Sequence, residues 1–328
     1  MRKLSVHTEI KDPKKEKAMK IMFMGTPEIS AICLDELVRR GHEVVAVVTG
    51  EDKPRGRKMI MTPTATKQKA EELGIPVYTP RTLRDEAFSA LLSEIAPELI
   101  AVVAYGKILP PSAIRFPKYG CVNLHVSLLP KYRGAAPMQR AIINGESETG
   151  VTVMYMNEGL DTGDIITVEK FPIGPEDDFE AIHDRSAEIG SALLSKALYD
   201  IRDGVAQRTP QDDSLATYAA KIEKEDCKLD FTKSAKILDF QIRGVTPIPG
   251  AFAYLKGKML KINKASPVRG VGAPGEVIAT DGSGEGSFTV ACGEGALLVR
   301  AVIPEGKGKM TAGDFIRGRK IEKGDVLS

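Results

Sequence analysis

Residues 20–48 read KIMFMGTPEISAICLDELVRRGHEVVAVV, and this stretch predicts a strand, a helix and a second strand in succession. The segment at 20–24, apolar from Ile21 to Met24, is long enough for one buried strand. Between 28 and 40 the apolar side chains recur every three or four positions, and Gly41 is typical of a helix end. Residues 43–48 are rich in valine, which favours a strand. A strand, a helix and a strand in this order indicate two parallel strands of one sheet.

The same alternation continues downstream. Helices are expected at 64–73, 84–95 and 179–203, and strands at 75–78, 99–105, 121–126, 151–156 and 165–171. Strands that alternate with helices predict a parallel sheet with a helix on each crossover. The fold class is therefore α/β, with a Rossmann-like domain expected over residues 19–204.

The texture changes after Gly204. Residues 205–220 are polar and are expected to be a linker between domains. Beyond a helix at 235–242, the chain has short strand-like runs separated by glycines, at 251–255, 259–262, 275–278, 288–291 and 296–302. Short strands at this spacing predict a small, OB-like β-barrel, so a second domain is expected over residues 221–328.

Length and composition agree with two cytoplasmic domains. A chain of 328 residues exceeds the usual size of a single core. Its apolar runs are strand-sized, so no membrane span is expected. The four cysteines are widely spaced and show no paired motif, which favours a reducing compartment without disulfides or zinc. Residues 1–18 resemble neither a signal nor a transit peptide and are expected to be a disordered extension or leader before a start at Met19.

Residues 121–130, CVNLHVSLLP, carry the strongest chemical signal. Asn123 and His125 are two positions apart, so on a strand their side chains point to the same face. Ligands of open α/β sheets bind at the carboxyl ends of such strands. An amide donor beside an imidazole suits the oxyanion of an acyl transfer. The plainer alternative is a buried histidine and asparagine that satisfy each other.

This run, together with KYRGAAP at 131–137 and GLDTGD at 159–164, resembles the signature of the folate-dependent formyltransferases. The resemblance identifies Asp161 as the third catalytic group. Its separation from His125 (161 minus 125, or 36 residues) leaves room for a helix and a strand that return the loop to the site. The resemblance implies that Asn123 binds the formyl oxygen, that His125 stabilises the oxyanion, and that Asp161 tunes His125 and moves a proton.

The same resemblance implies a donor, 10-formyl-tetrahydrofolate, and a site for it. The implied folate-binding residues are Tyr105, Ser127, Leu128, Leu129, Pro130 and Leu160. Tyr105 is read equally well as an ordinary residue at the end of a strand. No metal is expected, because the histidines at 7, 42 and 183 have no clustered ligands in the sequence.

Two basic regions bear on the acceptor. The loop after the second strand carries Lys53, Arg55, Arg57 and Lys58. The C-terminal region carries Lys256, Lys258 and Lys261, and segments 221–231, 247–251 and 315–320 resemble the C-terminal domain of the family branch that acts on initiator methionyl-tRNA. Lysine and arginine suit phosphate contacts, so the resemblance implies this tRNA as partner, with no obligate protein partner. The plainer alternatives are a solvated loop and a basic surface kept for solubility.

Other functions remain open at this point. A sugar-nucleotide N-formyltransferase would share Asn123, His125 and Asp161 but would need no basic C-terminal domain. A folate-dependent hydrolase, the folate domain of a larger dehydrogenase, or a tRNA-binding module with an inactive core are further possibilities. Nicotinamide binding is disfavoured because the sequence after the first strand, Gly25-Thr26-Pro27, lacks the G-x-G-x-x-G pattern.

Overall fold

The computed structural model describes residues 18–56 and 59–328, so the expected leader at 1–17 lies outside the described residues. The chain forms two compact units. Of the described residues, the first unit comprises 18–56, 59–123 and 194–206, and the second comprises 124–193 and 207–328. The expected boundaries at 204 and 220 stay predictions.

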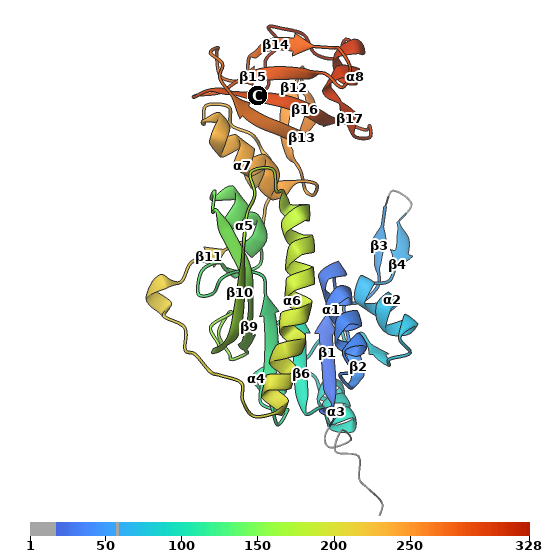
Figure 1. Ribbon diagram of the computed structural model, residues 1–328. Coiled ribbons are helices and arrows are strands. Elements are labelled where there is room, and N and C mark those ends of the chain that lie inside the picture. Colours follow the sequence, from blue (N-terminus) through green and yellow to red (C-terminus); the bar gives the residue numbers. More distant parts are fainter. Residues whose placement is uncertain (1–17, 57–58) are drawn as a thin grey trace, which may run out of the picture. The chain divides into compact units, whose positions relative to one another are not determined.

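The first unit is built on parallel strands in the hydrogen-bonded order β7-β6-β1-β2-β5 (Figure 1). β1 pairs in parallel with both β2 and β6, which confirms the parallel sheet predicted from the alternation. The elements of this unit are β1 (Ile21–Gly25), α1 (Glu28–Arg39), β2 (Val44–Val48), β3 (Lys53–Arg55), β4 (Ile60–Thr62), α2 (Ala65–Glu72), β5 (Val77–Tyr78), α3 (Glu86–Ile95), β6 (Leu99–Val103), α4 (Pro111–Ile114) and the start of β7 (Cys121–His125).

The turn from β1 into α1 explains why glycine stands at position 25. A Cβ there would lie 2.5 Å from the Ser30 Cβ and 2.9 Å from the Val103 carbonyl oxygen. Ser30 Oγ donates a 2.6 Å hydrogen bond to that carbonyl. The helix and the neighbouring strand therefore approach more closely than a larger residue would allow.

β3 and β4 pair as antiparallel strands, where residues 53–58 were read from the sequence as a basic loop. The exposed side of this pair includes Met59, Ile60 and Met61, which are each at least 60% exposed. Arg57 and Lys58 lie outside the described residues, and only the backbone of Arg55 is described.

The second unit continues the strand order as β7-β9-β10, with β10 antiparallel to β9. A helix and a strand, α5 and β9, separate His125 from Asp161, as the spacing predicted. The elements between β7 and the C-terminal sheet are β8 (Arg133–Gly134), α5 (Pro137–Ile143), β9 (Glu148–Tyr155), β10 (Ile165–Pro172), α6 (Phe179–Arg202, which ends in the first unit), η2 (Asp213–Leu215), β11 (Tyr218–Ala219), η3 (Glu225–Cys227) and α7 (Ala235–Val245).

The C-terminal sheet is antiparallel, in the order β12-β13-β16-β15-β14 with β17 on β16. Its elements are β12 (Ala251–Leu255), β13 (Lys258–Val268), β14 (Val277–Asp281), β15 (Ser287–Ala291), β16 (Ala296–Pro304), β17 (Met310–Thr311) and α8 (Ala312–Arg317). Leu260, Phe288 and Leu297 are among its buried core residues.

The expected closed barrel is not found among the described strands, because the two end strands β12 and β14 do not pair. The last residues of the chain lie between them instead. On β12, the Tyr254 carbonyl accepts a 3.0 Å hydrogen bond from the Ser328 amide. On β14, the Val277 amide donates a 2.8 Å hydrogen bond to the Asp325 carbonyl. A short terminal segment thus bridges the opening by isolated hydrogen bonds rather than by a continuous ladder.

Candidate active site

β7 carries the two candidate groups that the sequence placed on one strand. Val122 and Leu124 are fully or almost fully buried on one face of β7. Asn123 and His125 alternate with them along the strand, so their side chains point to the other face. Asn123 is half-buried, and His125 is only 6% exposed. The strand therefore holds His125 in a fixed place, away from bulk water.

A backbone carbonyl fixes one side of the His125 ring. Nε2 lies 2.9 Å from the carbonyl oxygen of Tyr132. A carbonyl can only accept a hydrogen bond, so Nε2 carries a proton and Nδ1 is left for chemistry. Tyr132 has φ +61°, a left-handed conformation uncommon for a bulky residue. In this conformation the Tyr132 carbonyl points at the His125 imidazole, and such uncommon backbone conformations are often found at functional sites.

Asp161 faces the other side of the ring. Its Oδ2 lies 3.7 Å from Nδ1 of His125 and accepts a 2.9 Å hydrogen bond from the Gly134 amide. Asp161 also has a left-handed backbone, with φ +54°. The distance of 3.7 Å is too long for a direct hydrogen bond. A proton on Nδ1 can therefore be stabilised by the carboxylate and still be donated to a bound group. The structure thus brings His125 and Asp161 together.

The Ser127–Pro130 loop is held by internal hydrogen bonds. Ser127 Oγ donates to the Lys131 carbonyl at 2.7 Å, so this hydroxyl shapes the loop. Thr152 Oγ1 donates to the Ser127 carbonyl at 2.7 Å and accepts from the Leu129 amide at 3.3 Å. The Leu129–Pro130 peptide bond is cis. The loop is therefore a preformed turn, with Leu128 and Pro130 only partly buried.

The two remaining candidate folate residues lie in different units. Tyr105, in the first unit, is 4% exposed, and its hydroxyl has no hydrogen-bond partner within the described part of the chain. Burial raises the pKa of Tyr105 to about 12, so the phenol stays protonated and able to donate. Leu160, in the second unit, is 60% exposed. Both placements leave their role in folate binding as a prediction.

The predicted tRNA-binding residues are exposed to different degrees. Lys53 and Lys258 are exposed. Lys256 pairs with Asp325 at 2.8 Å, and Lys261 donates to the Pro249 carbonyl at 2.7 Å. Lys258 and Lys261 are three positions apart in an unbroken register, so they lie on opposite faces of β13.

Several residues around His125 and Asp161 were not singled out from the sequence. Tyr132 and Arg133 lay inside the KYRGAAP motif, whose resemblance was the only signal for them. Gln211 lies in the segment read as a linker, and nothing in its neighbourhood marked it. Its amide donates to the Asp161 and Gly163 carbonyls, each at 2.8 Å.

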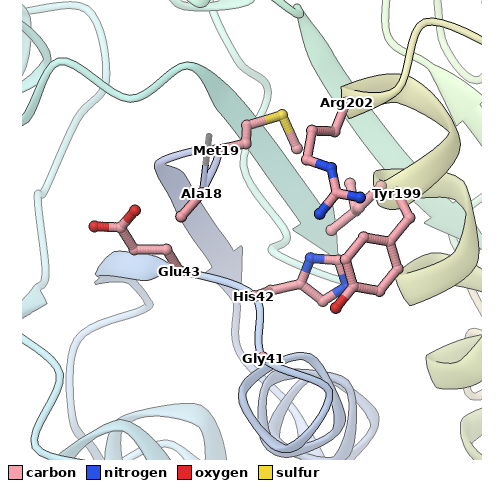
Figure 2. Close-up of a pocket in the computed structure, with 8 residues that line it drawn as sticks. Ala18, Met19, Gly41, His42, Glu43, Tyr199 and Arg202 are labelled. Atoms are coloured by element: carbon pink, nitrogen blue, oxygen red, sulfur yellow. The ribbon is translucent and has the colours of Figure 1, made fainter. Parts of the chain in front are cut away.

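A second histidine, His42, lies in the first unit, and Figure 2 shows it beside Tyr199 and Arg202. The His42 ring stacks on Tyr199, with centroids 4.2 Å apart, and His42 Nε2 lies 2.8 Å from Ser195 Oγ. Burial, and then the positive charge of Arg202, lowers the pKa of His42 to about 4. This histidine is therefore held neutral and serves packing. Within residues 18–56 and 59–328, no three His, Cys, Asp or Glu side chains gather as metal ligands would.

Comparisons with known proteins match the family and the fold. The formyl transferase model matches residues 19–198, and the model of the formyl transferase C-terminal domain matches residues 221–320. An N-formyltransferase from Helicobacter canadensis, solved with folinic acid and dTDP-3-aminofucose, has a TM-score of 0.63 at 20% identity, over 86% of this chain and 98% of that chain. HypX from Aquifex aeolicus has a TM-score of 0.64 at 22% identity, over 95% of this chain and 51% of that chain. These similarities show a shared fold.

The fold and these family matches define a formyl-transferring enzyme. A methionyl-tRNA formyltransferase from Citrifermentans bemidjiense is 44% identical over 94% of this chain and 96% of that protein. One from Pelotomaculum thermopropionicum is 45% identical over 94% of this chain and 98% of that protein. The chain belongs to the methionyl-tRNA formyltransferase family.

Proposed function

We propose that this enzyme transfers the formyl group of 10-formyl-tetrahydrofolate to the amino group of methionyl initiator tRNA. The observation that carries the proposal is the buried His125–Asp161 pair, 3.7 Å apart, in a chain whose relatives of 42–45% identity are named for this acceptor. The alternative acceptor, a sugar nucleotide, has only the distant N-formyltransferase at 20% identity in its favour.

The residues divide the work of an acyl transfer. The Asn123 amide donates a hydrogen bond to the formyl oxygen, and a proton on Nδ1 of His125 stabilises the negative charge that develops there. The acceptor amine attacks the formyl carbon directly, and Asp161 helps to remove its proton. The tetrahedral intermediate then collapses: the bond between the formyl carbon and N10 of the donor breaks, N10 takes up a proton, and tetrahydrofolate leaves. Because the Tyr132 carbonyl holds Nε2, the ring cannot turn away from the reacting atoms.

The donor supplies the formyl group, and three features of the chain suit its flat, polar ring system. The loop at Ser127–Pro130 is preformed, Leu160 is exposed for apolar contact, and the Tyr105 hydroxyl is buried with no partner in the described chain. A buried donor without a partner destabilises the protein, and a bound group that accepts its hydrogen bond removes this cost.

For the acceptor, we propose that Lys53, Arg55, Arg57 and Lys58 contact phosphates of the tRNA acceptor stem. Lys256, Lys258 and Lys261 would do the same from an OB-like C-terminal domain at 221–328, joined through 205–220 to the catalytic domain at 19–204. No helix in the described part of the chain has the length and apolar character needed to cross a bilayer. We also propose a cytoplasmic location, which the four free, widely spaced cysteines favour.

The test measures formyl transfer from 10-formyl-tetrahydrofolate to methionyl initiator tRNA, with an amino-sugar nucleotide as parallel acceptor. We expect transfer to the tRNA alone, weakening as salt is added because phosphate contacts release counterions. Arg57→Ala should raise the KM for tRNA several-fold, as expected from about 1 kcal/mol for a lost phosphate contact. Transfer only to the sugar would overturn the proposed acceptor.

A further inference from the structure

The segment that follows α6 pairs with the backbone beside the catalytic residues. β11 runs parallel to β8, with Tyr218 opposite Arg133 and Ala219 opposite Gly134. A Cβ at Gly134 would lie 2.8 Å from the Ala219 carbonyl oxygen, so glycine is needed for this close approach. The segment is thus part of the wall of the site, although its sequence reads as a linker.

Gln211 in this segment holds the loop of the catalytic carboxylate. Its Nε2 donates 2.8 Å hydrogen bonds to the carbonyls of Asp161 and Gly163. Asp161 is 50 residues away in sequence and has a left-handed backbone. Two carbonyls fixed by one amide restrict the backbone from which the carboxylate projects.

A buried arginine determines which way the Gln211 amide points. Arg133 is 2% exposed, and its Nε and Nη2 donate to Gln211 Oε1 at 3.2 and 2.8 Å. A guanidinium only donates hydrogen bonds, so Oε1 must face it and Nε2 must face the two carbonyls. Arg133 also pairs with Asp213 at 2.7 Å, which anchors it to the same segment.

Thr217, in the same segment, holds the backbone next to His125. Its Oγ1 accepts a 2.9 Å hydrogen bond from the Tyr132 amide, and its carbonyl accepts from the Arg133 amide at 2.9 Å. Tyr132 is the residue whose carbonyl holds His125 Nε2. The Tyr132 phenol is tied down separately, by a 2.7 Å hydrogen bond to Glu146.

We infer that Gln211 and Thr217 are positioning residues for the formyl transfer, with Gln211 acting on Asp161 and Thr217 on His125 through Tyr132. The inference rests on the proposed function. The segment that joins the two expected domains thereby also sets the distance between the catalytic imidazole and carboxylate. Misplacement of a reacting group by about 1 Å costs on the order of 100-fold in rate.

The sharpest variant is Gln211→Glu. It is almost isosteric and keeps an oxygen for Arg133, now as a charged pair, but it replaces the donor to Asp161 and Gly163 with a second acceptor. A residue that only packs against Arg133 would tolerate this change. A positioning residue would not, because a carboxylate oxygen would face two carbonyl oxygens. Gln207→Glu makes the same chemical change at an exposed position four residues earlier and is the matched control.

We expect Gln211→Glu to lower kcat about 10- to 100-fold, while the KM values for donor and tRNA stay within about threefold. Thr217→Val, which removes the acceptor for the Tyr132 amide and keeps the shape, should lower kcat less, by about threefold to tenfold. Gln207→Glu should stay within about twofold. A kcat for Gln211→Glu within twofold of the unsubstituted enzyme would overturn the inference.

A second readout does not depend on activity. The Gly134 amide donates to Asp161 Oδ2, so its hydrogen exchange reports where the carboxylate lies. Gln211→Glu should speed this exchange at least tenfold relative to Gln207→Glu. If the unsubstituted enzyme forms no formyl-methionyl-tRNA but the exchange responds, the proposed function fails and the positioning stands. If the enzyme is active and neither kcat nor exchange changes, the positioning fails alone.

Discussion

The two units each contain a histidine held by a neighbour's oxygen, and the two rings are put to opposite uses. His42, in the first unit, meets the Ser195 hydroxyl, the face of Tyr199 and the positive charge of Arg202. His125, in the second unit, meets a backbone carbonyl and the carboxylate of Asp161. A cation nearby disfavours imidazolium, and an anion nearby favours it. The two rings therefore differ in the sign of the charge beside them, although burial is the larger cause of the lowered pKa of His42.

The largest expected effect is that of His125→Ala. Without the imidazole, the developing oxyanion loses a charged donor, and we expect kcat to fall about 1,000-fold. The companion variant His42→Ala should keep kcat within about twofold. Steady-state formylation assays, with circular dichroism as the folding check, compare the two. Equal losses in both variants would remove the distinction between the two rings.

Asp161→Asn tests the anionic side of the comparison. The amide keeps the size of the carboxylate but removes the negative charge 3.7 Å from His125 Nδ1 and the group proposed to help take up the proton of the amine, so we expect kcat to fall about 100-fold. The affinity for the folate donor should change less than about threefold, because the charge acts on the histidine. Single-turnover kinetics and folate titration give the two quantities. An unchanged rate would mean that another group moves the proton.

The pH dependence of the free energy of unfolding tests the surroundings of His42, the ring beside the positive charge of Arg202. The pKa of His42 is lowered to about 4 in the folded protein, below its ordinary value of 6.5. The unfolded chain therefore binds a proton first as the pH falls, and the stabilisation present above pH 6.5 is lost between about pH 6.5 and 4. Because the ring is partly exposed, we expect a loss of about 1–2 kcal/mol in the free energy of unfolding.

Denaturant unfolding at several pH values measures this loss. His42→Gln does not titrate at this position but can still bond to Ser195, so its stability should change less over the same pH window. The same slope in both proteins would contradict a neutral His42 in the folded state.

Arg202→Gln should give the smallest change. The charge of Arg202 is a lesser cause of the lowered pKa of His42 than burial. Its removal should therefore raise that pKa by only a few tenths of a unit, on the order of 0.5 kcal/mol. An NMR titration of the His42 ring measures the midpoint. If the pKa of His42 returned all the way from about 4 to 6.5, charge rather than burial would be the main cause of its lowering.

Local patterns in the sequence predicted most of the secondary structure, because the periodicity of apolar residues is a local property. The strand–helix–strand order gave β1, α1 and β2, and the Asn123–His125 spacing placed both groups on β7. The antiparallel pair of β3 and β4 was missed, because it is short and largely exposed and lacks an apolar alternation. Closure of the predicted OB-like barrel was not found among the described strands, because hydrogen bonding between end strands depends on distant parts of the chain.

By itself the sequence determined the parallel α/β fold and the family, and it predicted the catalytic groups, since a long motif specifies its residues position by position. Only the tertiary structure decided the 3.7 Å separation of His125 and Asp161 and the contacts of Gln211 and Thr217 with their backbones. The physical reason is distance along the chain. Gln211 lies 50 residues from Asp161, and Thr217 lies 85 residues from Tyr132, so no local pattern records their contact.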